Sequence, residues 1–518
     1  MTDFEQPARG HVVAFALPFW SHVKPLCALI ARTVRLHCVA ATFFTEASIL
    51  DKVVDEFTRQ FITENDKNMR ELIRVVSLPA LPAPFKFDPY VSAFIDAYKA
   101  LCEGRPVQTS FGNGFVRAVR SPQLVVIDFF CYDALCGVRS ISGSAVPIFT
   151  WQTGAVSALL FMFGPEEMGG SGDPAEKFSK ICAEDREDQE NEIMTIYRRL
   201  KGQLIDLPGI PPMYDHEFIP QMTALPAKPV NVPLMFQYAH RFLRESDGVI
   251  NNSSRIYERD AINKVQEWFG TRPVLAVGPL SPPTTSIEIE LEKSKSPITS
   301  DVENFLDCAL NKYGPNSVVY ISLGTVWWPA EPEKIWAIID VLIEQEIPFL
   351  FSYAAPMARI PEFVSTKIRT SELGLEASWL PQQTIFHHKA CGWFISHCGQ
   401  NSIMEALSAG VPLICWPFDV DQPINAANIS VVHEVGYELF EVRTGYGLRP
   451  LHRLGNRTPD GTIEAVRREV TEVFSKARGE DGHKKRKKAQ WFSQKLAEGW
   501  EHGGLAWLDL NKLSSIFV

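Results

Sequence analysis

Hydrophobic and polar positions alternate in blocks along the chain, in a pattern that predicts buried strands followed by helices. Residues 11–18 are almost continuously apolar, which is typical of a parallel strand covered on both faces. Residues 26–36 then carry apolar side chains at helical spacing, and Pro25 suits the first turn of that helix. Residues 124–130 form a second strand of the same type. The alternation predicts an α/β protein with doubly wound parallel sheets.

The same alternation restarts in the second half of the chain. Residues 281–301 are rich in Ser, Thr, Pro and charge and have no clean period, so they are predicted to be a linker. A chain of 518 residues exceeds the roughly 250–300 residues that one core supports, which also favours two domains. Beyond the linker we expect a strand, a helix ended by Pro348, and two more strands, at 317–323, 333–346, 349–353 and 391–396.

Composition narrows the class of protein. The net charge of −10 argues against nucleic acid as the main partner, because phosphate binding needs a basic face. Ten scattered cysteines without a Cys-x-x-Cys pair favour reduced thiols of an intracellular protein over a disulfide frame or a zinc site. No apolar run approaches the roughly 18 residues of a membrane span, and the polar start is unlike a signal peptide. We expect a cytoplasmic protein, monomeric by default.

Three irregular segments interrupt the alternation. Residues 164–192 are Gly-rich and then acidic, which favours a solvated loop or exposed helix, with a lid over a substrate as the alternative. Residues 443–462 carry four glycines and are predicted to be a surface loop. The basic run 483–488 is interpreted as one face of a helix rather than a nuclear signal, because Trp491, and later Leu496, continue at helical spacing.

The segment from Trp379 to Gln422 carries the most chemical information. Its strand 391–396 is followed by a turn with Gly399, where a ligand could approach the backbone closely. Asn401 or Ser402 is then expected to cap a helix that Gly410 ends. Free N–H groups and the partial positive charge at such a helix start bind phosphate, and the turn lies at the carboxyl edge of the sheet, where ligands bind.

The full segment, WLPQQTIFHHKACGWFISHCGQNSIMEALSAGVPLICWPFDVDQ, resembles the signature box of the plant secondary-product glycosyltransferases, within the UDP-glycosyltransferase family of GT-B fold. It has the full length of that box without a gap. The resemblance implies a UDP-sugar donor whose base stacks on Trp379 and whose uridine is held by Gln382. It also implies that Glu405 accepts hydrogen bonds from the ribose hydroxyls. The residues that the resemblance places at the diphosphate are His397, Asn401 and Ser402, and those at the transferred sugar are Asp421 and Gln422.

Two further positions bear on the donor. Gly324 and Thr325 end a strand and resemble the family's turn facing the phosphates. Gln400 stands where the family usually has tryptophan, beside the sugar and phosphate. Glutamine at the position of Gln422 goes with glucose in the family, so glucose is expected, with N-acetylglucosamine, xylose or glucuronic acid as alternatives.

Asp419 and Asp421 form an Asp-x-Asp that could hold Mg²⁺ or Mn²⁺. Their place inside the box favours a metal-independent site instead.

Two residues of the first half are candidates for catalysis. His22 lies in the segment that leaves the first strand, where an imidazole can act as general base near neutral pH. Asp128 ends another buried strand and could orient that imidazole. The alternatives are a histidine without chemistry and a capping carboxylate, for which Asp133 is a rival. Both positions resemble the family's catalytic pair, with Ser21 in place of the usual glycine.

The resemblance implies GT-B architecture, two Rossmann-like domains facing each other across a cleft. The domains are predicted as an acceptor-binding domain, 1–280, completed by a C-terminal helix, 490–518, and a UDP-sugar-binding domain, 302–489, joined by the linker. The acceptor would be a phenolic, flavonoid, terpenoid or sterol. Its candidate lining residues, several of which could instead be core, are Phe19, Trp20, Phe85, Phe87, Phe129, Trp151 and Phe161.

The reaction implied is a single inverting displacement that turns an α-linked donor into a β-glycoside. Three other functions stay open. One is a UDP-sugar epimerase or hydrolase, which would not need the pair of His22 and Asp128. Another is a non-catalytic UDP-sugar-binding protein, which would need neither of these two residues. A dinucleotide dehydrogenase is disfavoured, because no Gly-x-Gly-x-x-Gly follows the first strand.

Overall fold

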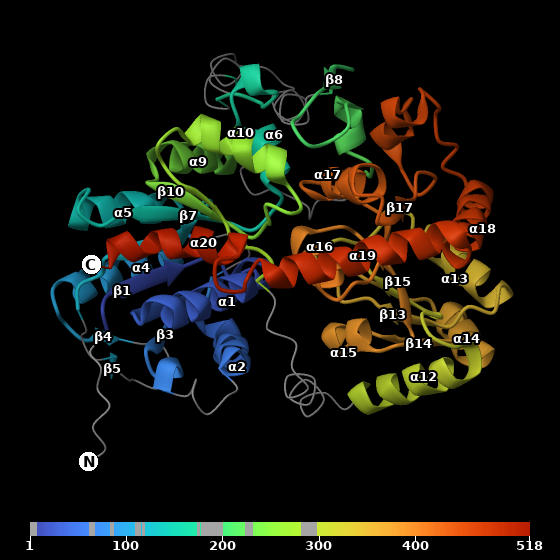
Figure 1. The fold of residues 1–518 in the computed structure, drawn as a ribbon, viewed down its shortest axis with the longest axis horizontal. Coiled ribbons are helices and arrows are strands. Elements are labelled where there is room, and N and C mark those ends of the chain that lie inside the picture. Colours follow the sequence, from blue (N-terminus) through green and yellow to red (C-terminus); the bar gives the residue numbers. More distant parts are fainter. Residues whose placement is uncertain are drawn as a thin grey trace.

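The computed structural model describes residues 8–61, 68–82, 87–108, 115–116, 120–173, 177, 200–222, 232–280 and 298–517. Two α/β halves lie side by side, each built on one parallel sheet (Figure 1). This confirms the predicted α/β fold class with two Rossmann-like domains. Phe85, most of 164–192 and most of the predicted linker lie outside the described residues.

The first sheet is seven-stranded and parallel, in the order β11-β10-β7-β6-β1-β2-β3. Side chains alternate between its two faces, so Val13 joins one buried core and Val12 the other. Helices α1 and α2 cover the second of these faces, and α4, α5, α6, α9 and α10 cover the first. The strands are β1 His11–Phe15, β2 Ala40–Glu46, β3 Ile73–Leu78, β6 Leu124–Asp128, β7 Ile148–Gln152, β10 Gly248–Asn251 and β11 Val274–Ala276. The helices are α1 Trp20–His37, α2 Leu50–Gln60, α4 Asp88–Cys102, α5 Tyr132–Ser142, α6 Val156–Phe163, α9 Val232–Glu245 and α10 Arg259–Phe269.

The second sheet is also parallel, in the order β14-β13-β12-β15-β16-β17. Helices α13, α14 and α18 bury apolar side chains on one face, and α12, α15, α16, α17 and α19 on the other. The strands are β12 Val318–Ser322, β13 Phe349–Ser352, β14 Gly374–Ala377, β15 Cys391–Ser396, β16 Leu413–Cys415 and β17 Gly436–Glu438. The helices are α12 Ile298–Tyr313, α13 Glu333–Glu344, α14 Glu362–Ser371, α15 Gln382–His387, α16 Gln400–Ser408, α17 Gln422–Ala427, α18 Ile463–Arg478 and α19 Glu480–Glu498.

Short elements complete the described chain. The small antiparallel pairs are β4 Val107–Gln108 with β5 Phe115–Val116, and β8 Leu204–Ile205 with β9 Met213–Tyr214. The single-turn segments are η1 Ala47–Ile49, η2 Glu166–Met168, η3 Asp215–Phe218, η4 Asn428–Val432, η5 Gly445–Leu448, η6 His452–Leu454 and η7 Lys512–Ile516. None of the helices in the described ranges is both long and apolar enough to cross a membrane.

The C-terminal part of the chain crosses from the second half back to the first. The basic run belongs to α19, as expected, and α19 packs on α16. A second helix, α20 Leu505–Asn511, packs on α1 and β11 of the first half (Figure 1). The single helix predicted for 490–518 is therefore wrong: the chain breaks at Gly499–Gly504, where Gly503 has a φ of +82°.

Three other predictions about elements need correction. Helix α12 begins at Ile298, inside the predicted linker, because Thr299 and Val302 are buried on its inner face. Helix α1 begins at Trp20, earlier than the start expected near Pro25. Pro25 is the sixth residue of that helix rather than part of its first turn. The segment 443–462 contains η5 and η6, and Arg443 in it is fully buried.

A buried ionic cluster joins the two halves at this last segment. Glu217 in η3 accepts a hydrogen bond from Arg453 Nε at 3.1 Å. Arg453 and Arg443 also donate to Glu438 at the end of β17, over 2.5 and 2.8 Å. Desolvation opposes these charges, but the two guanidinium groups still hold the pKa of Glu438 below its ordinary value. Breaking one partner of such a buried cluster would leave a charge uncompensated.

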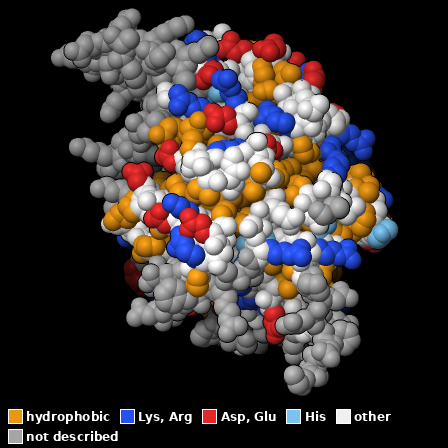
Figure 2. Space-filling view, turned by 90° about the vertical axis from the view of Figure 1, so that its left-hand side faces the viewer, with side chains coloured by type: hydrophobic (Ala, Val, Ile, Leu, Met, Phe, Trp, Pro, Cys, Tyr) orange, Lys and Arg blue, Asp and Glu red, His pale blue; other side chains and the backbone are white. Residues whose placement is uncertain are grey.

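On the end of the first half that Figure 2 presents, basic and acidic side chains are interspersed with apolar and neutral ones.

Candidate active site where the two sheets meet

His22 and Asp128 form the hydrogen-bonded pair expected from the sequence. His22 Nδ1 lies 2.6 Å from Asp128 Oδ2, and the Asp128 side chain is fully buried while that of His22 is 17% exposed. Strand β6 ends at Asp128, next to β1 in the sheet, so both residues reach the same edge. Asp128 Oδ1 also accepts a hydrogen bond from the backbone N–H of Phe130 at 3.2 Å. The carboxylate is thus held in place, and it leaves His22 Nε2 as the outward-facing ring nitrogen.

The first turn of α1 contacts the second half of the protein directly. Pro25 has no N–H, so it cannot bond the carbonyl of Ser21 one turn earlier. Asn401 Nδ2, in the first turn of α16, donates to that carbonyl at 2.8 Å. The proline inside α1 therefore leaves the Ser21 carbonyl available as an acceptor. Through this carbonyl the second half binds the residue next to His22.

Asn252 and Gln400 extend this contact. Asn252 follows β10, and its Nδ2 donates to Asn401 Oδ1 at 2.7 Å. Gln400 Nε2 donates to the backbone carbonyl of Asn252 at 3.1 Å. Gln400 is only 3% exposed, and its Oε1 is buried without a hydrogen-bond partner among the described residues. These three amides form one polar seam between the carboxyl edges of the two sheets.

The start of α16 differs from the sequence prediction in one respect. Gly399 is the N-cap residue, so Asn401 and Ser402 lie in the first turn of α16 rather than at its cap. Gly399 makes no side-chain bond to the helix start, and the first amide, that of Gln400, donates to Asp421. The amides of Asn401 and Ser402 are therefore the candidates for a ligand. Gly410, with a φ of +71°, ends the helix as predicted.

His397 sits in front of this helix between two glycines. A Cβ atom placed on Gly324 or Gly399 would come within 2.8 or 2.7 Å of His397 Nε2, so both positions need glycine for the imidazole to fit. Within the described part of the chain, His397 Nδ1 is buried without a hydrogen-bond partner. Desolvation lowers the pKa of His397 to about 4, so the ring is neutral at neutral pH.

Three side chains contact the carboxylate of Glu405. Its Oε2 accepts hydrogen bonds from Gln382 Nε2 and Gln383 Nε2, each at 2.7 Å. Its Oε1 lies 2.8 Å from Lys24 Nζ, which comes from α1 of the first half. The carboxylate is therefore oriented from both halves of the protein.

Asp421 and Gln422 lie beside the polar seam. Asp421 Oδ2 accepts a hydrogen bond from the backbone N–H of Gln400 at 3.1 Å, and burial raises the pKa of Asp421 to about 6. Gln422 Oε1 accepts from the backbone N–H of Phe418 at 2.9 Å. Two donor-site candidates lie farther out: Trp379 is 48% exposed, and Thr325 is exposed after Gly324, whose φ is +80°.

The comparisons with known proteins agree with this geometry. The family model for UDP-glucoronosyl and UDP-glucosyl transferase matches residues 191–442. A UDP-glycosyltransferase, eriJ of Hericium erinaceus, is 29% identical over 481 residues, which are 90% of each chain. The chain is similar to UDP-glycosyltransferases over most of its length. It is a glycosyltransferase enzyme of GT-B fold.

Other UDP-glycosyltransferases match parts of the chain or its fold. An anthocyanidin 3-O-glucosyltransferase of Solanum melongena is 34% identical over 199 residues, 38% of this chain and 42% of its own. A solved structure of Phytolacca americana UGT2, complexed with UDP-2fluoro-glucose and pterostilbene, has a TM-score of 0.66. It is 20% identical to this chain and covers 99% of it, with 100% of its own length matched.

Only some of the predicted acceptor-lining residues of this UDP-glycosyltransferase lie at the site. Trp151 is fully buried in the core, where its Nε1 donates to the His22 carbonyl at 3.0 Å, so it supports His22 rather than lining a pocket. Phe129 and Phe161 are also core residues, with 4% and 9% exposure. Phe19 and Phe87 are partly buried, with their ring centroids 6.0 Å apart, and Phe19 lies 5.7 Å from the His22 ring. Trp20 is half-buried on the opposite core.

Sequence reasoning missed four residues at the site. Asn252, Gln383 and Lys24 contact the predicted donor residues, and the Phe130 ring lies 6.2 Å from that of His22. Phe130 follows Asp128 by two residues and could have been found from that spacing. Lys24 and Asn252 contact residues far away in the sequence, so no local pattern indicates them. In the described ranges, no three His, Cys, Asp or Glu side chains gather as a metal site would require.

Proposed function

We propose that the protein is an inverting, metal-independent glucosyltransferase that transfers glucose from UDP-glucose to a hydroxyl of a small lipophilic acceptor. The observation that carries this proposal is the juxtaposition of two features. His22, paired with Asp128, stands two residues before Lys24 in α1, and Lys24 contacts α16, the helix of the predicted donor site. A direct transfer requires the general base to lie close to the site that binds the donor's phosphates. The seam brings these two features together.

His22 acts as the general base in this proposal. Asp128 accepts the Nδ1–H hydrogen bond, which leaves the Nε2 lone pair free to take the proton of the acceptor hydroxyl. The acceptor oxygen then attacks the anomeric carbon, and the bond from that carbon to the UDP oxygen breaks with its electron pair on UDP. Inversion turns the α-linked donor into a β-glycoside. Asp128 stabilises the imidazolium that forms.

The donor residues keep the roles expected from the family resemblance. Trp379 is exposed enough to stack on uracil, and Glu405 has lone pairs left for the ribose hydroxyls. The amides of Asn401 and Ser402 at the start of α16 receive the diphosphate. His397, neutral because of its low pKa, can donate one hydrogen bond there but supplies no charge. Asp421 and Gln422 hold the sugar.

The arrangement of Asp419 and Asp421 favours the metal-independent proposal over a cation site. Asp421 is buried and directed at the backbone N–H of Gln400, and Asp419 Oδ1 accepts a hydrogen bond from the N–H of Val420 at 2.8 Å. The two carboxylates are thus each engaged by backbone. The test with EDTA below checks this part of the proposal.

The acceptor is proposed to be a flat phenolic compound. Phe19 and Phe130 place partly buried rings near His22, and Phe87 lies edge-on to Phe19, which suits an aromatic acceptor beside the base. Among the relatives, anthocyanidin and flavonol glucosyltransferases have names that point to acceptors of this kind. Flavonoids therefore rank first, ahead of terpenoids and sterols.

The experiment is to incubate the purified enzyme with UDP-glucose, EDTA and a panel of phenolic and terpenoid acceptors, following UDP release and product mass. We expect a gain of one hexose, insensitive to EDTA and lowered on the order of 10²–10⁴-fold by His22→Ala. His483→Ala, which changes an exposed histidine on α19, is the matched control and retains activity. Release of UDP without acceptor, or a need for metal, contradicts the mechanism. Transfer only from another UDP-sugar contradicts the choice of glucose alone.

A further inference from the structure

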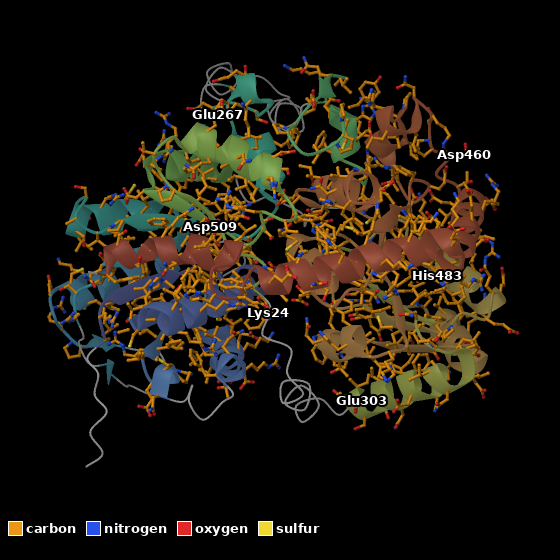
Figure 3. The ribbon with its side chains drawn as sticks, viewed as in Figure 1. Lys24, Glu267, Glu303, Asp460, His483 and Asp509 are labelled. Atoms are coloured by element: carbon orange, nitrogen blue, oxygen red, sulfur yellow. The ribbon has the colours of Figure 1, made fainter. Side chains whose placement is uncertain are left out.

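Helices α1 and α16 lie side by side at their starts. Asn401 and Glu405 are one turn apart on α16, and they contact Ser21 and Lys24, which are nearly one turn apart on α1. Figure 3 shows Lys24 at the centre of the molecule, where the two halves meet. The side chain of Lys24 is 24% exposed and that of Glu405 is 10% exposed, so this ion pair is largely shielded from water.

The predicted diphosphate site lacks a full positive charge on its own side. The start of α16 offers backbone N–H groups and a partial charge. His397 is neutral at neutral pH, because burial lowers its pKa to about 4. Asn401 and Ser402 are uncharged. A departing UDP gains negative charge as the sugar is transferred, so a nearby cation would lower the barrier.

Lys24 is within reach of that position. Asn401 and Glu405 are four positions apart on α16, which corresponds to about 6 Å along the helix axis. The lysine ammonium is a compact charge on a flexible four-carbon stem, so a rotation of that stem can cover this distance. Glu405 also receives two hydrogen bonds from Gln382 and Gln383, so it stays oriented when Lys24 leaves.

We propose that Lys24 is a donor-site residue supplied by the first half of the protein. When a UDP-sugar binds, ribose hydroxyls take the place of Lys24 at Glu405 Oε1, and the ammonium pairs with the diphosphate. Lys24 then stays paired with UDP as the bond to the sugar breaks. This inference rests on the proposed function, because it assumes that UDP-sugar binds along α16. It adds a residue of the acceptor-side half to the nucleotide site.

The test compares UDP with uridine, which has the same base and ribose but no phosphate. Binding of each to the intact enzyme is measured by titration calorimetry for the wild type, Lys24→Met and Lys24→Arg. We expect Lys24→Met to weaken UDP binding about tenfold more than uridine binding, and Lys24→Arg to stay within about threefold of wild type. Raising the salt concentration should weaken UDP binding less in Lys24→Met than in wild type.

The matched control is Lys264→Met. Lys264 forms an ion pair with Glu267 of the same length, 2.8 Å, on the first half and away from the seam, and Glu267 is labelled in Figure 3. This variant should bind both compounds as the wild type does. An equal loss of UDP and uridine binding in Lys24→Met would overturn the inference, since Lys24 would then act only through Glu405. Unchanged binding of both would overturn it too. A wild-type protein that binds no UDP would instead refute the proposed function.

Discussion

The two histidines on either side of the seam have opposite surroundings. His22, at the edge of the first sheet, has a buried carboxylate 2.6 Å from its Nδ1. His397, at the edge of the second, has a buried Nδ1 without a hydrogen-bond partner among the described residues, and burial lowers its pKa to about 4. The same side chain thus has a buried carboxylate as its partner in one place and is kept neutral by burial in the other. Each suits its expected substrate: a hydroxyl that loses a proton, and a diphosphate.

The contrast arises from what each strand places behind the ring. Strand β6 ends in Asp128, beside the strand that leads to His22. Behind His397 are Gly324 and Gly399, which admit the ring closely but offer it no side chain. A carboxylate stabilises an imidazolium, whereas desolvation alone disfavours it. Replacing Asp128 should therefore have a large effect at His22, whereas titration of His397, which has no such partner in the part of the chain that the structure describes, should have a small one.

The largest expected effect comes from removing the partner of His22. In Asp128→Asn, the amide can no longer stabilise the imidazolium, and it can favour the tautomer that carries its proton on Nε2. We expect kcat/KM to fall on the order of 10²–10³-fold, with donor affinity within about twofold of wild type. Steady-state kinetics with varied acceptor measure this loss.

Asp133→Asn is the control for that variant. Asp133 lies five residues after Asp128 in the first turn of α5 and is exposed. It should leave kcat/KM unchanged. Equal losses in both variants would mean that general negative charge near the site, rather than the contact with Nδ1, supports the reaction.

A smaller effect is expected on the donor side. Glu405→Ala removes the carboxylate that orients Gln382 and Gln383, and it removes the proposed partner of the ribose hydroxyls. We expect the KM for UDP-glucose to rise about tenfold, with the KM for acceptor within about twofold. Glu498→Ala, on the surface of α19, is the control and should change neither. A rise confined to the acceptor KM would place Glu405 outside the donor site.

The sequence predicts an element or contact of this protein well where neighbouring residues in the chain determine it. The strand at 391–396 was predicted with both ends correct, because its apolar run is bounded by a polar turn. The contact between His22 and Asp128 followed from a rule of topology, that adjacent parallel strands end at the same edge. The fold class is confirmed. The catalytic and binding roles and the exact domain limits stay predictions.

The errors concern features that tertiary packing decides. Trp151 looked like a pocket residue, but an aromatic ring in an apolar strand has the same pattern whether it faces a core or a ligand. Pro25 suggested a helix that begins at that residue, whereas Asn401 from the second half compensates for its missing bond. Lys24 and Glu405 are 381 residues apart in the chain, so only the assembled structure could pair them.

The smallest effect concerns the pH dependence of stability at His397. Its pKa is about 4 in the folded protein and 6.5 in the unfolded chain, so the unfolded chain binds more protons between these values. This contribution to stability is complete above pH 6.5 and is lost as the pH falls toward 4. Between pH 7 and 4.5 it should cost the wild type about 2 kcal/mol more than His397→Asn, which does not titrate there. Other buried histidines, such as His11, are common to both proteins and cancel. Urea unfolding of both proteins at the two pH values measures the difference, and equal losses would show that folding does not lower the pKa of His397.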